Sequence, residues 1–359
     1  MGKKILVMKG DHIGPEVTDQ GLKVLHVMAA KTGVELELEA DLLGGCSIDV
    51  HGIALTDEAY AKAEAADAIL FGAAGGPDWD GMRFKRKKQR DGLLALRKGL
   101  DLFANLRAVK VFDSAVDAST LKPEHVRGAD VMILRELTGG IYFGEPRGIR
   151  EEDGERFALN TMIYTEKEVR RIVRRGCEIA RKRSGKLMSV DKANATEVGR
   201  FWRDIATEVA ADYPDVEFDS MYVDNAAMQI IRNPRQFDTI VTGNMFGDIL
   251  SDAAGNLTGS LGMLPSASLG ENHALYEPCH GSAPDISGRD IANPVASILS
   301  VGMLFRYTLD KPEADEAIHR AVEQVLATHR TADIMAEGKN QVGCSQMGDL
   351  IVQHLEEQP

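Results

Sequence analysis

Short apolar runs alternate along the chain with stretches whose apolar residues recur at helical spacing. The runs are rich in Val and Ile, a composition typical of short strands buried on both faces of a sheet. The pattern therefore predicts strands at residues 4–8, 68–72, 131–137, 186–190 and 239–242.

The segments between these runs are expected to be helices. Pro15 is well placed in the first turn of the first helix. Thr165 and Glu168 have the spacing of a capping box, and an apolar stripe follows them as far as Gly185. A further helix is expected over residues 194–213. Alternating strands and helices predict an α/β architecture in which helices cover a mixed sheet.

Length and composition narrow the class of protein. The chain has 359 residues, enough for two packed domains, and its 44% hydrophobic and 27% charged residues are typical of soluble globular proteins. No apolar run is long enough to span a bilayer, and the N-terminus is interpreted as the first strand of a cytoplasmic protein. The cysteines have no metal-binding spacing and are expected to be buried, reduced thiols: Cys46, Cys177, Cys279 and Cys344.

The chain is acidic, with a formal net charge of −13. The electric field of this negative charge repels a phosphate backbone, so nucleic acid is not an expected partner. An anionic ligand would need basic residues concentrated locally. One basic run, 85–88, lies in a segment expected to be a mobile loop, 77–89. Either a solvated surface or a ligand contact explains this run.

The chain lacks the Gly-x-Gly-x-x-Gly fingerprint of an ordinary dinucleotide-binding fold. A nucleotide site must then be built in another way, and residues 277–286 are the candidate. This segment is rich in Gly, Ser and Pro, so its backbone N–H groups can approach a phosphate. Asp285 within it can accept hydrogen bonds from ribose hydroxyls.

Three aspartates are candidate metal ligands. Asp248 and Asp252 are four residues apart, which places both carboxylates on one face of a helix where they can bind one hard cation. Asp224 follows a strand-like segment and is a possible third oxygen ligand. The preference of helix N-termini for acidic residues explains the first two equally well.

Basic and phenolic residues complete the candidate chemistry. Arg97, Arg107 and Arg135 interrupt apolar segments, so they are expected to pair with carboxylates of the protein or of a ligand. Lys192 can act as a base near a bound metal, and Tyr142 can donate a proton to a carbanion. A surface lysine and a packed tyrosine are the plainer interpretations of the last two.

Residues 135–148, RELTGGIYFGEPRG, resemble the signature of the isocitrate and isopropylmalate dehydrogenases, a family of β-hydroxyacid oxidative decarboxylases. The resemblance extends over almost the whole chain. It includes residues 93–98, 102–107, 191–194, 244–252 and 280–286.

The resemblance implies an isopropylmalate dehydrogenase-like α/β fold, with two domains that share a large mixed sheet. The first, cofactor-side domain would comprise residues 1–102 and 259–359. The second, 103–258, would carry the metal and substrate residues and the dimer interface. The family pattern is a homodimer with shared active sites, in which Lys192 and Asp224 enter the partner's site.

The resemblance also implies a reaction: NAD-dependent, metal-assisted oxidative decarboxylation of 3-isopropylmalate in leucine biosynthesis. Lys192 would take the hydroxyl proton and Tyr142 would reprotonate the enol carbon. Mg²⁺ or Mn²⁺ would be bound by Asp224, Asp248 and Asp252. The substrate would contact Leu93, Leu94, Arg97, Arg107, Arg135 and Asp224. NAD would contact Glu277, His280, Gly281, Ser282, Ala283, Asp285, Ile286 and Asn293.

Two departures from the family pattern bear on the substrate. Arg90 stands where leucine-pathway members carry Glu, and Ala195 replaces a commoner Val. A cation beside the pocket of Leu93 and Leu94 would admit a polar 3-substituent. D-malate, tartrate, another 3-alkylmalate and homoisocitrate therefore remain alternative substrates. A non-redox magnesium protein that binds a phosphorylated ligand is a third hypothesis, against which the intact Lys192, Tyr142 and aspartates argue.

Overall fold

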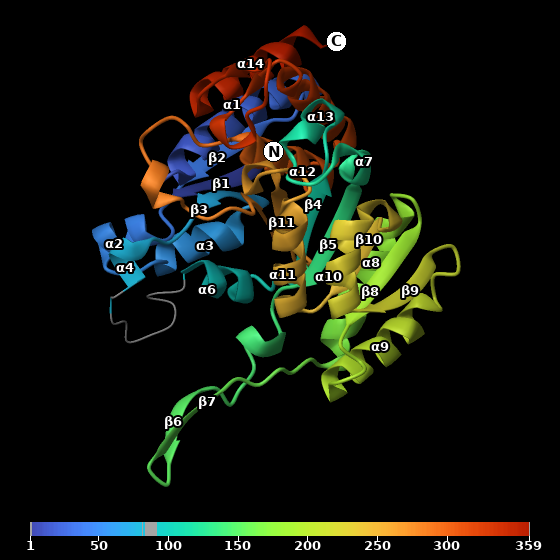
Figure 1. The fold of residues 1–359 in the computed structure, drawn as a ribbon. Helices are drawn as coiled ribbons and strands as arrows, with labels where there is room; N and C mark the ends of the chain where they lie inside the picture. The colour runs from blue at the N-terminus through green and yellow to red at the C-terminus, as the bar shows by residue number, and fades with distance from the viewer. Residues whose placement is uncertain (1, 81, 83–91, 359) are drawn as a thin grey trace. The chain divides into compact units, whose positions relative to one another are not determined.

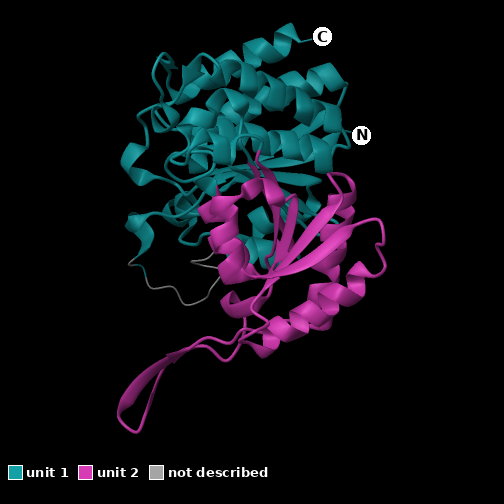
Figure 2. Ribbon diagram, turned by 45° about the vertical axis from the view of Figure 1, so that its right-hand side comes forward, with its two compact units in different colours: residues 1–102, 110–128, 255–359 teal, residues 103–109, 129–254 magenta. Residues whose placement is uncertain are grey.

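The computed structural model describes residues 2–80, 82 and 92–358. It has an α/β fold whose main sheet contains ten strands of mixed direction, so the predicted fold class is confirmed. Contacts divide the chain into two compact units (Figure 2). Unit 1 comprises Met1–Leu102, Lys110–Gly128 and Gly255–Pro359, and unit 2 comprises Phe103–Val109 and Ala129–Ala254.

Unit 1 supplies five strands, in the order β2-β1-β3-β12-β11. All pair in parallel except β11 and β12, which are antiparallel. The apolar run predicted at 68–72 is fully buried, as expected for a central strand. The bounds of the five strands are β1 Lys3–Gly10, β2 Leu36–Ala40, β3 Ala68–Ala73, β11 Pro265–Leu269 and β12 Ala274–Pro278.

The helices α1 (Gly14–Thr32), α12 (Val295–Tyr307), α13 (Pro312–Leu326) and α14 (Cys344–Glu357) pack on one another in unit 1 (Figure 1). Helix α12 also contacts β11 and β12 and is buried from Val295 to Phe305, which explains why it is apolar almost all round. The shorter helices of this unit are α2 Gly45–His51, α3 Asp57–Ala65, α4 Pro77–Asp80, α6 Gly92–Gly99 and α7 Pro123–Val126.

Residues 110–128 belong to unit 1, whereas the sequence-based division assigned them to the middle domain. One contact that joins this segment to unit 1 is made by Arg330, whose side chain is fully buried. Its guanidinium donates to the carbonyls of Leu326 at 2.7 Å and Ile334 at 3.0 Å, and to Asp117 Oδ1 at 2.9 Å. Asp117 lies in the 3₁₀ helix Asp113–Ala118, which is thereby bound to the C-terminal part of the chain.

Unit 2 supplies the strands β4-β5-β10-β8-β9, of which β5, β10, β8 and β9 are parallel. A separate antiparallel hairpin, β6–β7, extends from this unit (Figure 1). The strand bounds are β4 Ala104–Lys110, β5 Asp130–Glu136, β6 Gly148–Glu152, β7 Glu155–Leu159, β8 Lys186–Asp191, β9 Glu217–Tyr222 and β10 Thr239–Thr242. The helices are α8 Glu166–Arg181, α9 Glu197–Ala210, α10 Val223–Arg232 and α11 Asn244–Gly255.

Most of the local predictions are confirmed, and the start of one helix is corrected. The capping box of Thr165 and Glu168 is present at the start of α8, and all five predicted strands are found. The helix predicted from residue 194 begins only at Glu197, because the Thr196 side chain accepts a hydrogen bond from the Gly199 N–H and acts as the N-cap.

The prediction of buried thiols is only partly correct. All four cysteines are free, but Cys46 and Cys279 are half-buried, whereas Cys177 and Cys344 are buried. Among the described helices, none is both long enough and apolar enough to cross a membrane.

Candidate functional site

The candidate catalytic residues of unit 2 lie where its parallel strands end. Arg135 is the penultimate residue of β5, and Lys192 directly follows β8. Asp224 lies in the first turn of α10, just after β9, and Asp248 lies on α11, which follows β10. The carboxyl ends of parallel strands meet at one edge of a sheet, where α/β proteins usually bind ligands.

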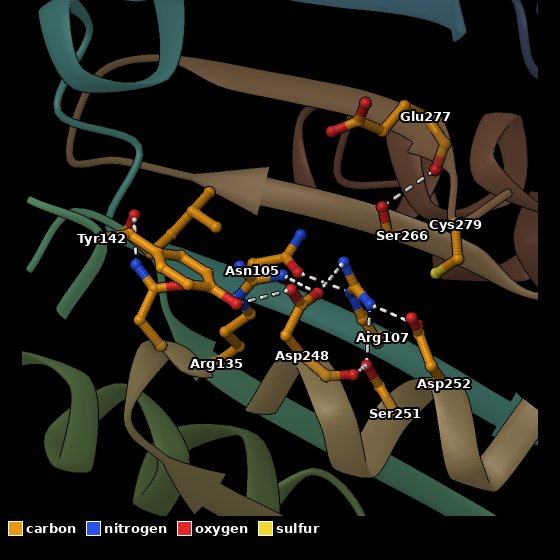
Figure 3. A network of polar contacts seen from close by, with 12 residues as sticks. Asn105, Arg107, Arg135, Tyr142, Asp248, Ser251, Asp252, Ser266, Glu277 and Cys279 are labelled. Atoms are coloured by element: carbon orange, nitrogen blue, oxygen red, sulfur yellow. Dashed lines mark hydrogen bonds and ion pairs between the residues drawn. The ribbon is translucent and has the colours of Figure 1, made fainter. Parts of the chain in front are cut away.

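Two arginines and two aspartates form an ionic cluster in unit 2 (Figure 3). Arg107 on β4 contacts Asp252 Oδ1 at 2.9 Å and Asp248 Oδ1 at 3.3 Å. Arg135 on the adjacent strand β5 bonds to the same Asp248 oxygen. The arginines are only 9% and 5% exposed, so burial keeps these charges close to carboxylates. We call Arg107, Arg135, Asp248 and Asp252 the acid–arginine cluster.

Neutral residues orient the arginines of this cluster. Arg107 donates to Asn105 Oδ1 at 3.0 Å and to Ser251 Oγ at 2.7 Å. Arg135 Nε donates to Asn244 Oδ1 at 2.8 Å. Sequence reasoning assigned none of these three contacts. Asn244 lies two residues after β10 and four residues before Asp248, but a neutral amide at such a position has no distinctive signal in the sequence.

Tyr142 ends a short 3₁₀ turn and lies beside the acid–arginine cluster, where its hydroxyl donates to Asp248 Oδ2 at 3.2 Å (Figure 3). Burial raises the pKa of Tyr142, and the nearby Asp248 carboxylate raises it further. The phenol therefore keeps its proton at neutral pH. Because 37% of the residue remains exposed, the hydroxyl is suited to proton donation to a small ligand.

Lys192 and Asp224 form another ion pair of unit 2, with 2.9 Å between Nζ and Oδ1. The hydrogen bond from Lys192 lowers the pKa of Asp224. The residue before Lys192 is held in place, because Asp191 accepts two hydrogen bonds from Arg203, each of 2.8 Å. The Asp224 side chain is 62% exposed, so this pair is open to contact with another molecule.

The structure brings two of the three predicted metal ligands together. Asp248 and Asp252 both bond to Arg107, as their spacing on one helix face predicts. Within the described part of the chain, no group of three or more His, Cys, Asp or Glu residues is placed to hold a metal ion. Asp224 therefore does not complete such a group within one chain. Paired carboxylate oxygens are nevertheless donors that suit a hard divalent cation.

The third candidate arginine, Arg97, lies on α6 of unit 1 and pairs with Glu277 on β12. Both side chains are largely buried, at 14% and 6% exposed. Glu277, predicted as a cofactor contact, is thus the carboxylate partner of Arg97. Leu93 and Leu94 on the same helix are half-buried, and Leu93 packs against the core of unit 1.

The predicted nucleotide loop follows β12 in unit 1. His280 is half-buried. Burial lowers its pKa, and its buried Nε2 atom has no hydrogen-bond partner. A Cβ added to Gly281 would meet no atom within 4 Å, so open space adjoins the backbone there. Ser282 Oγ donates to the Gly75 carbonyl at 2.6 Å. An orphaned buried nitrogen and an approachable backbone fit a bound nucleotide.

The rest of this loop is anchored to the unit 1 core. Ala283 has a left-handed φ of 41°, and Ile286 packs with Ala283 against a cluster of Ile13, Val17, Ala292 and Cys344. Asp285 is exposed and available to a ligand. Asn293 Oδ1 accepts a hydrogen bond from the Val295 N–H at 3.1 Å, at the start of α12.

Ala195 and Arg90 are the two residues expected to bear on the choice of substrate. Ala195 is exposed in the turn after Lys192, where its N–H donates to the Lys192 carbonyl at 3.1 Å. Arg90 and the basic run 85–88 lie outside the described residues.

Comparison with known proteins identifies the family. The family model described as "Isocitrate/isopropylmalate dehydrogenase" matches residues 4–351. The 3-isopropylmalate dehydrogenases of Chromohalobacter salexigens and Aquifex aeolicus are 56% and 54% identical to the chain. Each alignment covers 98% of the chain, and 98% and 97% of the two relatives.

Solved structures give the same result. An isocitrate dehydrogenase from Methylococcus capsulatus superposes with a TM-score of 0.87 at 32% identity, covering 99% of this chain and 100% of that one. A β-decarboxylating dehydrogenase from Thermococcus kodakarensis gives 0.80 at 31% identity, covering 99% and 96%. The family predicted from the sequence motifs is confirmed: the chain belongs to the isocitrate/isopropylmalate dehydrogenase family.

Proposed function

We propose that the protein oxidises and decarboxylates 3-isopropylmalate to 4-methyl-2-oxopentanoate with NAD and Mg²⁺ or Mn²⁺, as a step of leucine biosynthesis. The observation that carries the proposal is the acid–arginine cluster with the Tyr142 hydroxyl hydrogen-bonded to it. Relatives at 56% and 54% identity over nearly the full length carry the name 3-isopropylmalate dehydrogenase, which supports this substrate.

The arginines are the proposed clamp for the substrate carboxylates. Arg107 and Arg135 are almost fully buried and already held in place by Asn105, Ser251 and Asn244. Planar guanidinium groups fixed in this way recognise carboxylates through paired hydrogen bonds. Arg97, held by Glu277, is the proposed third member, as the family resemblance implies.

Proton transfers are assigned to two residues. Lys192 takes the proton of the substrate's 2-hydroxyl, and Asp224, which accepts its hydrogen bond, orients it. Tyr142 returns a proton to C3 after CO₂ has left, since its raised pKa keeps the hydroxyl protonated until then. Both side chains are partly exposed, as contact with a substrate requires.

The proposed cofactors match the donor groups available. Asp248 and Asp252 would bind the divalent cation together with Asp224 of a second chain, and the loop from Glu277 to Asn293 would bind NAD. When bound, NAD accepts the hydride from C2, and the cation stabilises negative charge on the substrate oxygen. Asp285 is exposed on that loop, and an acidic side chain there favours NAD over NADP, whose 2′-phosphate it would repel.

We infer that the active form is a homodimer. Most of the exposed large apolar side chains in the described residues belong to unit 2, although it is the smaller unit. Apolar side chains concentrated on one unit are typical of a protein interface. They are Tyr142, Ile149, Phe157, Ile163, Phe201, Tyr222, Met228 and Ile249.

A substrate panel tests this function. Absorbance of NADH should rise when the protein is mixed with NAD, Mg²⁺ and racemic 3-isopropylmalate, and EDTA should abolish the rise. The values of kcat/KM are then compared for 3-isopropylmalate, D-malate, tartrate and homoisocitrate. A preference of more than about tenfold for one of the other acids, roughly 1.4 kcal/mol in the transition state, would refute the leucine-pathway assignment.

A further inference from the structure

We propose that Tyr164, which has no role in the mechanism above, is a positioning residue: it fixes the first turn of α11 and the turn that ends at Tyr142. This inference rests on the proposed function, because its kinetic readout uses that reaction. Tyr164 lies between β7 and α8 in unit 2, one residue before the N-cap Thr165.

The Tyr164 hydroxyl supports the start of α11. The backbone N–H of Asn244, the first residue of this helix, donates to Tyr164 Oη at 2.7 Å. The first N–H groups of a helix have no partner within the helix, so an external acceptor stabilises its first turn. Asp248, one turn further along, belongs to the acid–arginine cluster. Tyr164 thus sets where the helix that carries these carboxylates begins.

The side chain of Asn244 links the first turn of α11 to Arg135, a residue of the proposed substrate clamp. Its Oδ1 accepts from Arg135 Nε at 2.8 Å. Its Nδ2 donates to the carbonyls of Leu137 at 3.1 Å and Gly139 at 3.0 Å. Asn244 is buried and uses both ends of its amide, so a shift of its backbone must also move Arg135 or break these bonds.

Three glycines pack closely against Tyr164. A Cβ on Gly140, whose φ is +74°, would lie 2.3 Å from Tyr164 Oη. One on Gly243 would lie 3.0 Å from the same atom, and one on Gly139 3.0 Å from the ring. Gly139 and Gly140 lead directly to Tyr142. The turn that ends at Tyr142 therefore packs against the Tyr164 side chain.

Tyr164 is itself held rigidly. Its ring meets that of Trp202 edge to face, with centroids 5.3 Å apart, and Trp202 Nε1 donates to Ser189 Oγ at 3.1 Å. Burial raises the pKa of Tyr164, so the hydroxyl stays neutral. Together with Ile141, Lys192 and other residues, Tyr164 lines a pocket of unit 2, which places it next to the groups it would position.

The variant Tyr164→Phe removes one oxygen atom and tests the proposal. We expect kcat/KM for 3-isopropylmalate to fall about tenfold, the effect of losing one hydrogen bond that holds the site, while KM for NAD stays unchanged. In the double variant Tyr142→Phe/Tyr164→Phe, the total loss should be smaller than the product of the two single losses, because Tyr164 acts partly through Tyr142.

The matched control is Tyr213→Phe, which removes a phenolic oxygen from a tyrosine of unit 2 that packs on Arg181, away from the cluster. It should keep wild-type kinetics. Gly243→Ala presses a methyl group toward the same Tyr164 oxygen without requiring a positive φ. It should reproduce the kinetic change, and it replaces Tyr164→Phe if that variant does not fold.

Amide hydrogen exchange gives a readout that does not depend on turnover. The Asn244 amide should exchange faster in Tyr164→Phe than in the wild type, with α9 unchanged. Unchanged exchange, unchanged kinetics, or losses that add in the double variant would each overturn the proposal. If the wild type does not turn over 3-isopropylmalate, the proposed function fails, and the exchange experiment still decides the role of Tyr164.

Discussion

Arg107 and Arg135 show how a single residue type in an apolar setting points to chemistry. Both interrupt apolar strands and both are buried against aspartates. Their charge could be recognised from the sequence because an unpaired buried guanidinium is too costly to exist. Asn105 and Asn244, which orient them, could not be recognised, because a neutral amide gives no comparable signal in a sequence.

Arg135→Lys should raise KM for the hydroxy diacid and lower kcat/KM by about 10- to 100-fold, since an ammonium cannot bond Asn244 and a carboxylate through one planar group. Steady-state kinetics measures this. The control is Arg183→Lys, at an arginine paired with Asp238 and Asp130, which should leave KM unchanged. Equal KM values for Arg135→Lys and the wild type would exclude Arg135 from the substrate site.

His280 should make folding sensitive to acid. Burial lowers its pKa in the folded chain below the ordinary 6.5, so the unfolded chain binds the proton first as the pH falls. The free energy of unfolding should therefore fall as the pH drops through about 6.5. Urea unfolding between pH 7.5 and pH 5.5 measures the slope in the wild type and in His280→Asn. Identical slopes in the two proteins would show that His280 is not the group responsible.

At the scale of elements, periodicity and capping predicted what depends on local sequence. The fully buried β3 and the capped helix α8 were found where expected. Strand β2 was missed because its LELEA sequence lies exposed at a sheet edge, and β11 because its PSASL sequence is buried without being strongly apolar. Tertiary pairing, rather than local pattern, makes these segments strands.

Local pattern also fails to place the segment 110–128, which belongs to unit 1 and contacts Arg330 there. Arg330→Met keeps the volume but leaves the carbonyls of Leu326 and Ile334 and the Asp117 carboxylate without their donor. The loss should be about 2–4 kcal/mol of unfolding free energy by denaturant titration. Arg320→Met, on the exposed side of α13, is the control and should change stability little. A loss below about 0.5 kcal/mol would show that Arg330 does not anchor this segment.

At the scale of the whole molecule, the proposed metal site is one that the described residues of a single chain do not complete. Asp248 and Asp252 lie together, whereas Lys192 pairs with Asp224, and the described residues contain no three-ligand metal group. The sequence resemblance implied that Lys192 and Asp224 serve a second chain. Neither charge nor periodicity could reveal this division, because an assembly is not encoded in a local pattern.

Hybrid dimers test the shared site most directly. Lys192→Ala and Asp248→Asn chains are co-expressed with different tags, and the mixed dimer is isolated by both tags. Each parent dimer should be inactive. In the hybrid, one site combines an intact Asp248 with an intact Lys192 of the other chain, so its kcat should be about half that of the wild type. A hybrid as inactive as its parents would show that each chain uses its own lysine and would contradict the account.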